Sequence, residues 1–121
     1  MNKREKGREG ETIVAEYLQG EGYRILMRNF ISPFGEVDVI AEKDGVVAFI
    51  EVKSWSVIGW EDLERSVNQV KKRRILNTSR FFLMNHPEYA DAGIRYDIAF
   101  VEPEKVRIHY IPGAFTETDA A

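Results

Sequence analysis

Two runs of alternating polar and apolar residues, separated by Asp44-Gly45, constrain the fold of this chain most strongly. The runs span residues 36–41 and 46–53. An Asp-Gly pair between two such runs is a strong signal for a tight β-hairpin with a two-residue loop. A slip of one residue would mix the apolar and the charged residues on each face, which burial of the apolar face forbids. The hairpin register is therefore predicted twice, by the turn and by the pattern.

This register gathers four charged side chains on one face near the open end of the hairpin. With Lys43 facing Val46, it places Asp38 opposite Glu51 and Glu36 opposite Lys53. The other face then carries the four aliphatic residues Val37, Val39, Ile50 and Val52. Opposed carboxylates destabilise a sheet, and three carboxylates against one ammonium leave negative charge uncompensated. A hard divalent cation such as Mg²⁺ would offset that charge, whereas an exposed face of alternating charges is the alternative interpretation.

The remaining pattern predicts an α/β protein with a central mixed β-sheet flanked by helices. Helices are expected at residues 8–19 and 60–84, and strands at 23–30, 94–101 and 105–111, in addition to the hairpin. The order is α-β-β-β-α-β-β. We expect residues 1–115 to form a single domain and residues 116–121 to form a flexible tail.

Composition narrows the classes of function. The chain has 121 residues and no cysteine, which excludes disulfides and thiolate metal sites. It has no apolar run of the length that a membrane helix needs, and a cytoplasmic location is expected. The net charge of −3 argues mildly against a nucleic-acid partner. However, residues 61–80 carry six basic and three acidic side chains, so positive charge is concentrated in the second helix.

Several separated motifs resemble those of a known family. The runs Gly35-Glu36-Val37-Asp38-Val39-Ile40 and Phe49-Ile50-Glu51-Val52-Lys53 resemble the acidic motif of the restriction-endonuclease-like, PD-(D/E)xK, nuclease superfamily. More narrowly, the chain resembles the YraN-like family of small bacterial proteins, which is similar to archaeal Holliday-junction resolvases. The resemblance spans residues 7–115 and includes Gly7, Glu11, Asn29, Lys71, Arg95-Tyr96-Asp97 and Ala114-Phe115. One departure is Trp55, where the family often has an arginine that could contact phosphate.

The resemblance implies a restriction-endonuclease-like core and a metal-dependent endonuclease that hydrolyses phosphodiester bonds in DNA, branched or structured DNA included. It implies that Asp38 and Glu51 bind Mg²⁺ or Mn²⁺, with the backbone carbonyl of Val52 as a further ligand. Lys53 would orient or activate the attacking water, and Glu36 would support the site. A metal supplies both the nucleophile and the countercharge that this hydrolysis needs.

Two helical residues are expected to join this site. Glu11 forms an i, i+3, i+7 line with Val14 and Leu18, so its carboxylate leans toward the sheet, and the resemblance implies that it is a further catalytic residue and metal ligand. A helix-dipole role in the first turn is the alternative. Lys71 flanks a predicted buried stripe of Leu63, Val67 and Val70, and could reach a phosphate over the sheet.

The neighbours of Lys71 and a later strand supply the remaining candidates. Lys72 and Arg73 point further outward, where they would bind nucleic-acid phosphates non-specifically, although a solvated basic turn is the commoner meaning of such a run. Arg95 and Asp97 share a strand face, which favours a structural ion pair over catalysis.

Two other functions are open on the sequence. One is a nucleic-acid-binding module on a nuclease fold with little or no catalytic activity, which the net charge and Trp55 favour. The other is a protein-interaction domain, with Trp55, Trp60 and the Phe81-Phe82 pair as an exposed patch and a homodimer as one form of it.

Overall fold

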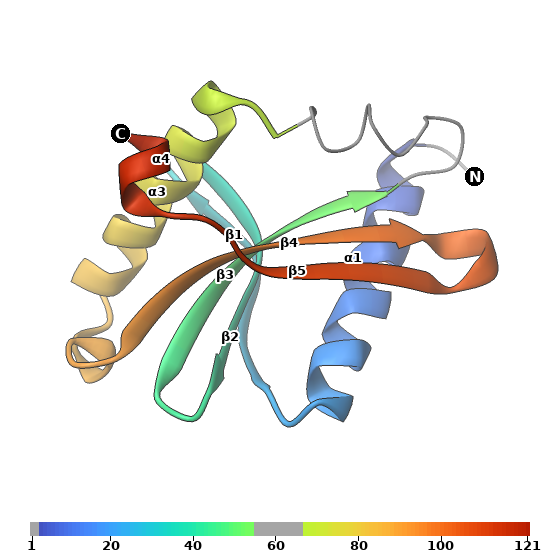
Figure 1. The fold of residues 1–121 in the computed structure, drawn as a ribbon, viewed down its shortest axis with the longest axis horizontal. Helices are drawn as coiled ribbons and strands as arrows, with labels where there is room; N and C mark the ends of the chain where they lie inside the picture. Colours follow the sequence, from blue (N-terminus) through green and yellow to red (C-terminus); the bar gives the residue numbers. More distant parts are fainter. Residues whose placement is uncertain (1–2, 55–66) are drawn as a thin grey trace.

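A five-stranded sheet with a long helix on each face forms the protein (Figure 1), in a computed structural model that describes residues 3–54 and 67–121. The strands lie in chain order: β1 (Arg24–Ser32), β2 (Gly35–Lys43), β3 (Val46–Ser54), β4 (Gly93–Glu102) and β5 (Arg107–Phe115). β3 and β4 are parallel and the other neighbours are antiparallel. The predicted α/β class with a mixed sheet is confirmed.

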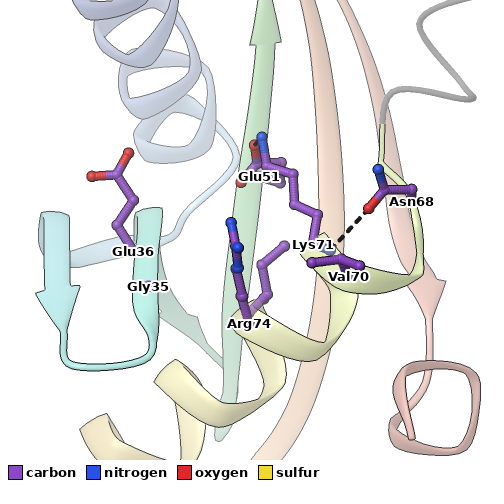
Figure 2. A pocket seen from close by; sticks show the side chains of 8 residues that line it. Gly35, Glu36, Glu51, Asn68, Val70, Lys71 and Arg74 are labelled. Atoms are coloured by element: carbon purple, nitrogen blue, oxygen red, sulfur yellow. Dashed lines mark hydrogen bonds and ion pairs between the residues drawn. The ribbon is translucent and has the colours of Figure 1, made fainter.

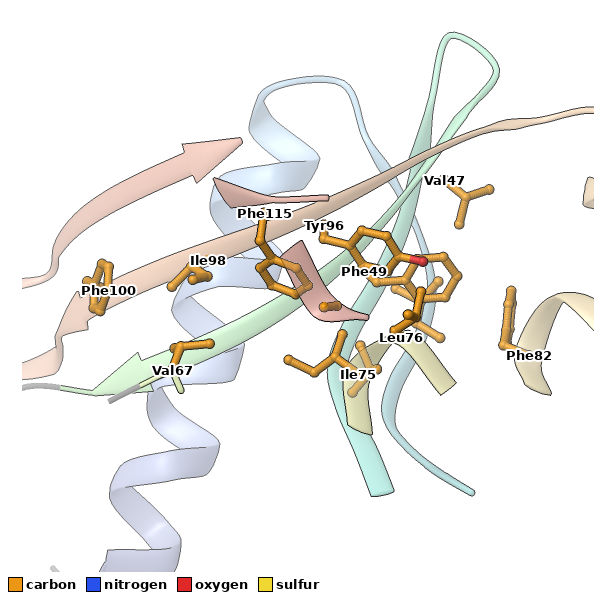
Figure 3. Packing of buried hydrophobic residues seen from close by; sticks show 13 residues of the cluster. Val47, Phe49, Val67, Ile75, Leu76, Phe82, Tyr96, Ile98, Phe100 and Phe115 are labelled. Carbon is orange, nitrogen blue, oxygen red and sulfur yellow. The ribbon is translucent and has the colours of Figure 1, made fainter. Parts of the chain in front are cut away.

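The helices cover the two faces of this sheet. α1 (Lys3–Gly20) packs on one face and α3 (Gln69–Met84) on the other, and each contributes to its own apolar cluster. Figure 3 shows the larger cluster, in which Phe49 and Tyr96 from the sheet pack against Ile75, Leu76 and Phe82 from α3. β3 and β4 are parallel neighbours, and α3 belongs to the connection between them, as a parallel pair requires. Short 3₁₀ turns, η1 (Pro87–Tyr89) and η2 (Pro103–Lys105), precede β4 and β5.

The predicted hairpin register is confirmed over most of its length. Lys43 pairs with Val46, and the register continues as far as Val39 with Ile50. Asp44 and Gly45 have φ values of 51° and 78°, the left-handed conformation that a tight two-residue hairpin loop uses.

The ladder between β2 and β3 ends one step before the predicted Asp38–Glu51 pair. There the backbone N–H of Val52 donates to Oδ2 of Asp38 at 2.7 Å. This hydrogen bond to a side chain takes the place of a hydrogen bond to a backbone carbonyl of β2. The two strands consequently part where their carboxylates lie.

The prediction that four aliphatic residues share one face is wrong for Val37. Val39, Ile50 and Val52 belong to the cluster under α1, but Val37 is fully buried in the cluster under α3. Asn29, on the neighbouring strand β1, has a left-handed φ of 52° beside this step. The alternation of side chains between the two faces of β2 is therefore broken between Val37 and Val39. The sequence pattern, which assumes strict alternation along a strand, does not reveal this break.

The second predicted helix is confirmed at its C-terminal part, as α3. Residues 60–66, which include Trp60 and Leu63, and also Trp55, lie outside the described residues. Val67 is buried, as expected, but Val70 is 54% exposed, so the predicted stripe is wrong at that residue. Its cause is that Val67 precedes the helix start at Gln69 and does not share the helical period.

The C-terminal residues pack against the body of the protein in the structure. α4 (Glu117–Ala120) begins with a capping box between Thr116 and Asp119, and Ala120 is fully buried beside α3. Flexibility of residues 116–121 in solution stays a prediction. Among the described helices, none has the length and apolar character needed to cross a membrane.

Candidate functional site

Three carboxylates are buried where β2, β3 and α1 meet. The exposed fractions are 9% for Glu11, 8% for Asp38 and 5% for Glu51. Glu36, the fourth predicted acid, is exposed at the start of β2. The sequence therefore predicted the members of this group, and the structure distinguishes three buried acids from one on the surface.

Asp38 is the most strongly perturbed of these acids. Its pKa is raised to about 8, mainly by burial and next by the negative charge of Glu51, which together outweigh the lowering effect of the hydrogen bond from Val52. Glu11 and Glu36 add smaller effects in the same direction. The raised pKa means that the surroundings of Asp38 disfavour its carboxylate form. A cation bound beside Asp38 would stabilise that form.

Two lysines face Glu51. Nζ of Lys71 lies 2.7 Å from Oε1 of Glu51, and Nζ of Lys53 lies 3.8 Å from the same oxygen. Burial and the neighbouring Lys71 lower the pKa of Lys53. Burial alone would lower the pKa of Lys71 too, but the charge of Glu51 and the hydrogen bond to it outweigh burial, and the pKa is raised. Lys71 is thus the firmer ionic partner of Glu51.

Glu11 projects from α1 toward the sheet, as its place beside Val14 and Leu18 predicts. Burial raises its pKa, although a hydrogen bond with the Asn29 side chain and the charge of Arg28 act in the opposite direction. Its Oε2 atom is buried and has no hydrogen-bond partner. A buried carboxylate oxygen without a hydrogen-bond partner lowers the stability of the folded protein. The same oxygen is available as a ligand for a cation.

An open cavity of about 540 Å³ lies beside these groups (Figure 2). Glu36 and Glu51 line it from the sheet, and Asn68, Lys71 and Arg74 line it from the start of α3. Figure 2 shows Lys71 and Arg74 extending from α3 toward the strands that carry the acids. The cavity therefore has acidic groups on one wall and basic groups on the other.

Two residues of this cavity were missed by the sequence reasoning. Arg74 stands one helical turn after Lys71, a spacing that places both on one side of a helix and could have identified it. Asn68 caps α3, because its side chain accepts from the backbone N–H of Lys71 at 3.0 Å. An Asn just before a helix is a recognisable cap, and the predicted earlier start of the helix concealed it.

The other predicted nucleic-acid-binding residues lie away from the acids. Nζ of Lys72 lies 5.8 Å from the centre of the Phe115 ring, and Arg73 is exposed. Gln69, the first residue of α3, donates through its side chain to the backbone oxygen of Ala121. The Phe81-Phe82 pair is not an exposed patch, because Phe82 is only 1% exposed and belongs to the core.

Arg95 and Asp97 form a separate cluster under α1. Asp97 is fully buried and accepts from Nε and Nη2 of Arg95, from the Tyr110 hydroxyl and from the backbone N–H of Gly113. Burial and the Asp97 charge raise the pKa of Tyr110, which keeps its phenol protonated as a donor. The contact expected from their shared face is present, and the hydrogen bonds from Tyr110 and Gly113 join β4 to β5.

The acids fit a hard divalent cation by their chemistry. Glu11, Asp38 and Glu51 offer oxygen donors with excess negative charge, one of them an orphaned oxygen. In the described part of the chain, however, no three acidic or histidine side chains are grouped closely enough to hold a metal ion. In addition, Lys71 already contacts Glu51. Ion binding at this site would therefore need the acids to draw closer together.

Comparison with known proteins gives a consistent match over most of the chain. The model of the uncharacterised protein family UPF0102 matches residues 10–101. A UPF0102 protein of Rhodopseudomonas palustris (strain BisA53) is 41% identical over 105 residues, which cover 87% of this chain and 79% of the relative. A UPF0102 protein of Persephonella marina is 40% identical over 110 residues, covering 91% and 92%. A third, of Myxococcus xanthus, is 36% identical over 115 residues, covering 93% and 90%.

Proposed function

The chain belongs to the uncharacterised protein family UPF0102, the YraN family, and we propose that it is a metal-dependent endonuclease that hydrolyses phosphodiester bonds in DNA. The observation that carries the proposal is that three carboxylates, those of Glu11, Asp38 and Glu51, are buried, with Lys53 beside Glu51. Buried like charges cost stability, so a chain that keeps them needs a use for them. The resemblance to the restriction-endonuclease-like superfamily supports the same reaction.

The residues take distinct roles in this proposal. Asp38 and Glu51 would hold Mg²⁺ or Mn²⁺, with Glu11 and the Val52 carbonyl as further oxygen donors. Such an ion supplies a nucleophile at neutral pH and a countercharge for the phosphate. Lys53 orients the attacking water and donates to a phosphate oxygen, while Glu36 supports the site from the cavity wall. Water adds to phosphorus and the P–O bond to the leaving sugar breaks, leaving a phosphate monoester and a hydroxyl.

The basic wall of the cavity supports nucleic acid as the substrate. Lys71 and Arg74 line the cavity that holds Glu51, and Lys72 and Arg73 extend the positive charge along α3. Phosphate contacts of this kind position a backbone without reading its sequence. We therefore propose that the protein selects DNA by shape, branched or structured DNA included.

Cleavage of labelled linear, flapped and four-way DNA in Mg²⁺ or Mn²⁺ tests the proposal. Lys53→Met and Asp38→Asn should each lower the rate by at least about 100-fold, the cost of removing one preorganised group from such a site. Glu42→Gln is the matched control, because Glu42 lies at the opposite end of β2 and pairs with exposed Arg24. Cleavage of no substrate by the parent, or equal rates for parent and Asp38→Asn, would contradict the proposal.

A binding module without catalysis is the second candidate. The 2.7 Å contact between Lys71 and Glu51 favours it, because an ammonium already neutralises one of the acids. This function predicts salt-sensitive DNA binding that needs no divalent cation and that Lys71→Ala weakens. Metal-dependent cleavage in the experiment above would exclude it.

A further inference from the structure

We propose that Lys71 is an internal counter-ion that holds Glu51 until a divalent cation displaces it, and that the displaced ammonium then binds nucleic-acid phosphate. The inference rests on the proposed metal site. It makes one lysine the link between cation binding and nucleic-acid binding at the same cavity.

The positive charge in this cluster is unevenly placed. Glu51 has ammonium groups at 2.7 and 3.8 Å, whereas Asp38 accepts only from the backbone N–H of Val52 among the contacts described, and one oxygen of Glu11 has no partner. A cation that takes Oε1 of Glu51 as a ligand would compete with Lys71 for that oxygen. Binding of the cation in this way displaces Lys71, and the loss of this charge-assisted contact weakens the cation's apparent affinity.

The cavity beside Lys71 has room for its displaced side chain. Its backbone is fixed in the first turn of α3 by the Asn68 cap, but its side chain is 37% exposed and lines the open cavity. A lysine side chain has four flexible carbons, so the ammonium can swing from Glu51 into the cavity without movement of the helix. Arg74 lines the same wall one turn later, so the released ammonium would join a second cation facing a phosphate.

Thermodynamic linkage follows from this exchange. If a divalent cation frees Lys71 for phosphate, the cation strengthens nucleic-acid binding, and nucleic acid strengthens cation binding by the same factor. Without a bound metal, Lys71 neutralises the charge of one of the three buried acids, Glu51.

Titration of the DNA-free protein with Mn²⁺ tests the displacement. Lys71→Met keeps the aliphatic stem and removes the competing charge, so it should bind Mn²⁺ about tenfold more tightly than the parent. Lys72→Met makes the same change in net charge one residue away, over the Phe115 ring, and should stay within about twofold of the parent. Equal or weaker binding by Lys71→Met than by Lys72→Met would overturn the inference alone. Failure of the parent and both variants to bind Mn²⁺ would overturn the proposed metal site as well.

A second arm tests the release of Lys71 without any metal. In EDTA, Glu51→Gln removes the charge that holds Lys71, so it should bind a fluorescein-labelled DNA duplex at least about threefold more tightly than Glu42→Gln, which changes the net charge equally. The gain should vanish in the Glu51→Gln, Lys71→Met double variant. A gain that persists in the double variant, or that Glu42→Gln reproduces, would overturn the inference.

Discussion

Asp38 both holds two strands together and is a predicted metal ligand. It joins β3 by accepting from the Val52 N–H, and it is also the acid whose charge the structure tolerates least. The hydrogen bond to Val52 needs only an oxygen acceptor, which an amide also provides. The charge of Asp38 is therefore dispensable for the fold and is kept for another reason.

Asp38→Asn should accordingly stabilise the metal-free protein. At pH 9 in EDTA, its melting temperature should lie several degrees above that of the parent, because the buried charge and its repulsion with Glu51 are gone while the acceptor for Val52 remains. Thermal denaturation followed by circular dichroism measures this. A lower melting temperature would show that the buried charge is compensated in the folded protein.

The same residue sets a pH dependence. The pKa of Asp38 rises from an ordinary 3.8 to about 8 on folding, so the folded state binds this proton more tightly. The contribution to the free energy of unfolding is fully present below about pH 4 and is lost as the pH rises through about 8. Subtracting the Asp38→Asn curve isolates it: the advantage of the variant should grow between these values and then level off. An advantage that is constant with pH would contradict the assignment.

At the scale of the element, the start of α3 determines where Lys71 lies. Asn68→Ala removes the cap and should cost about 1 kcal/mol of unfolding free energy in a urea titration. Asn68→Ser, which restores an oxygen acceptor at this position, is the matched control and should recover most of the loss. Equal stability of all three proteins would mean that the cap does not hold the helix start.

The pair of strands β4 and β5 depends on a single buried acid. Asp97→Asn leaves the Arg95 guanidinium and the Tyr110 hydroxyl without their charged acceptor, and should destabilise the protein by about 3 to 5 kcal/mol. Asp91→Asn, at an exposed position before β4, should change stability by less than about 0.5 kcal/mol. Similar stabilities for the two variants would contradict a structural role for Asp97.

At the scale of the whole molecule, the net charge of −3 hides an uneven distribution of charge. One of the buried acids, Glu51, lines the cavity, and the basic side chains of residues 71–74 lie along α3. A low overall charge is therefore compatible with a local phosphate-binding surface, because screening limits the reach of distant acids to about 10 Å.

This layout predicts modest, strongly salt-dependent affinity for DNA. Arg73→Ala and Lys72→Ala should each reduce the slope of log affinity against log salt by about one, whatever the sequence of the duplex. Fluorescence anisotropy over a series of salt concentrations measures the slope. Arg107→Ala, which removes an exposed charge at the start of β5, serves as the control. An unchanged slope for both helix variants would place the DNA elsewhere on the surface.

The sequence by itself determined the hairpin, its register from Lys43 with Val46 to Val39 with Ile50, and the residues that carry the acids. These follow from local physics, because a two-residue turn and a period of two fix pairing and faces over a few residues. It also supplied the class of fold, since helical and strand periods alternate clearly along the chain.

Only the tertiary structure decided which cation meets which acid. Lys71 on α3 contacts Glu51 on β3. Val37 lies on the opposite face from the one that regular alternation predicts, beside the left-handed Asn29. Asp97 on β4 accepts hydrogen bonds from Tyr110 and Gly113 on β5. Such contacts depend on how helices and twisted strands pack at a distance, and residue spacing along one element carries no information about them.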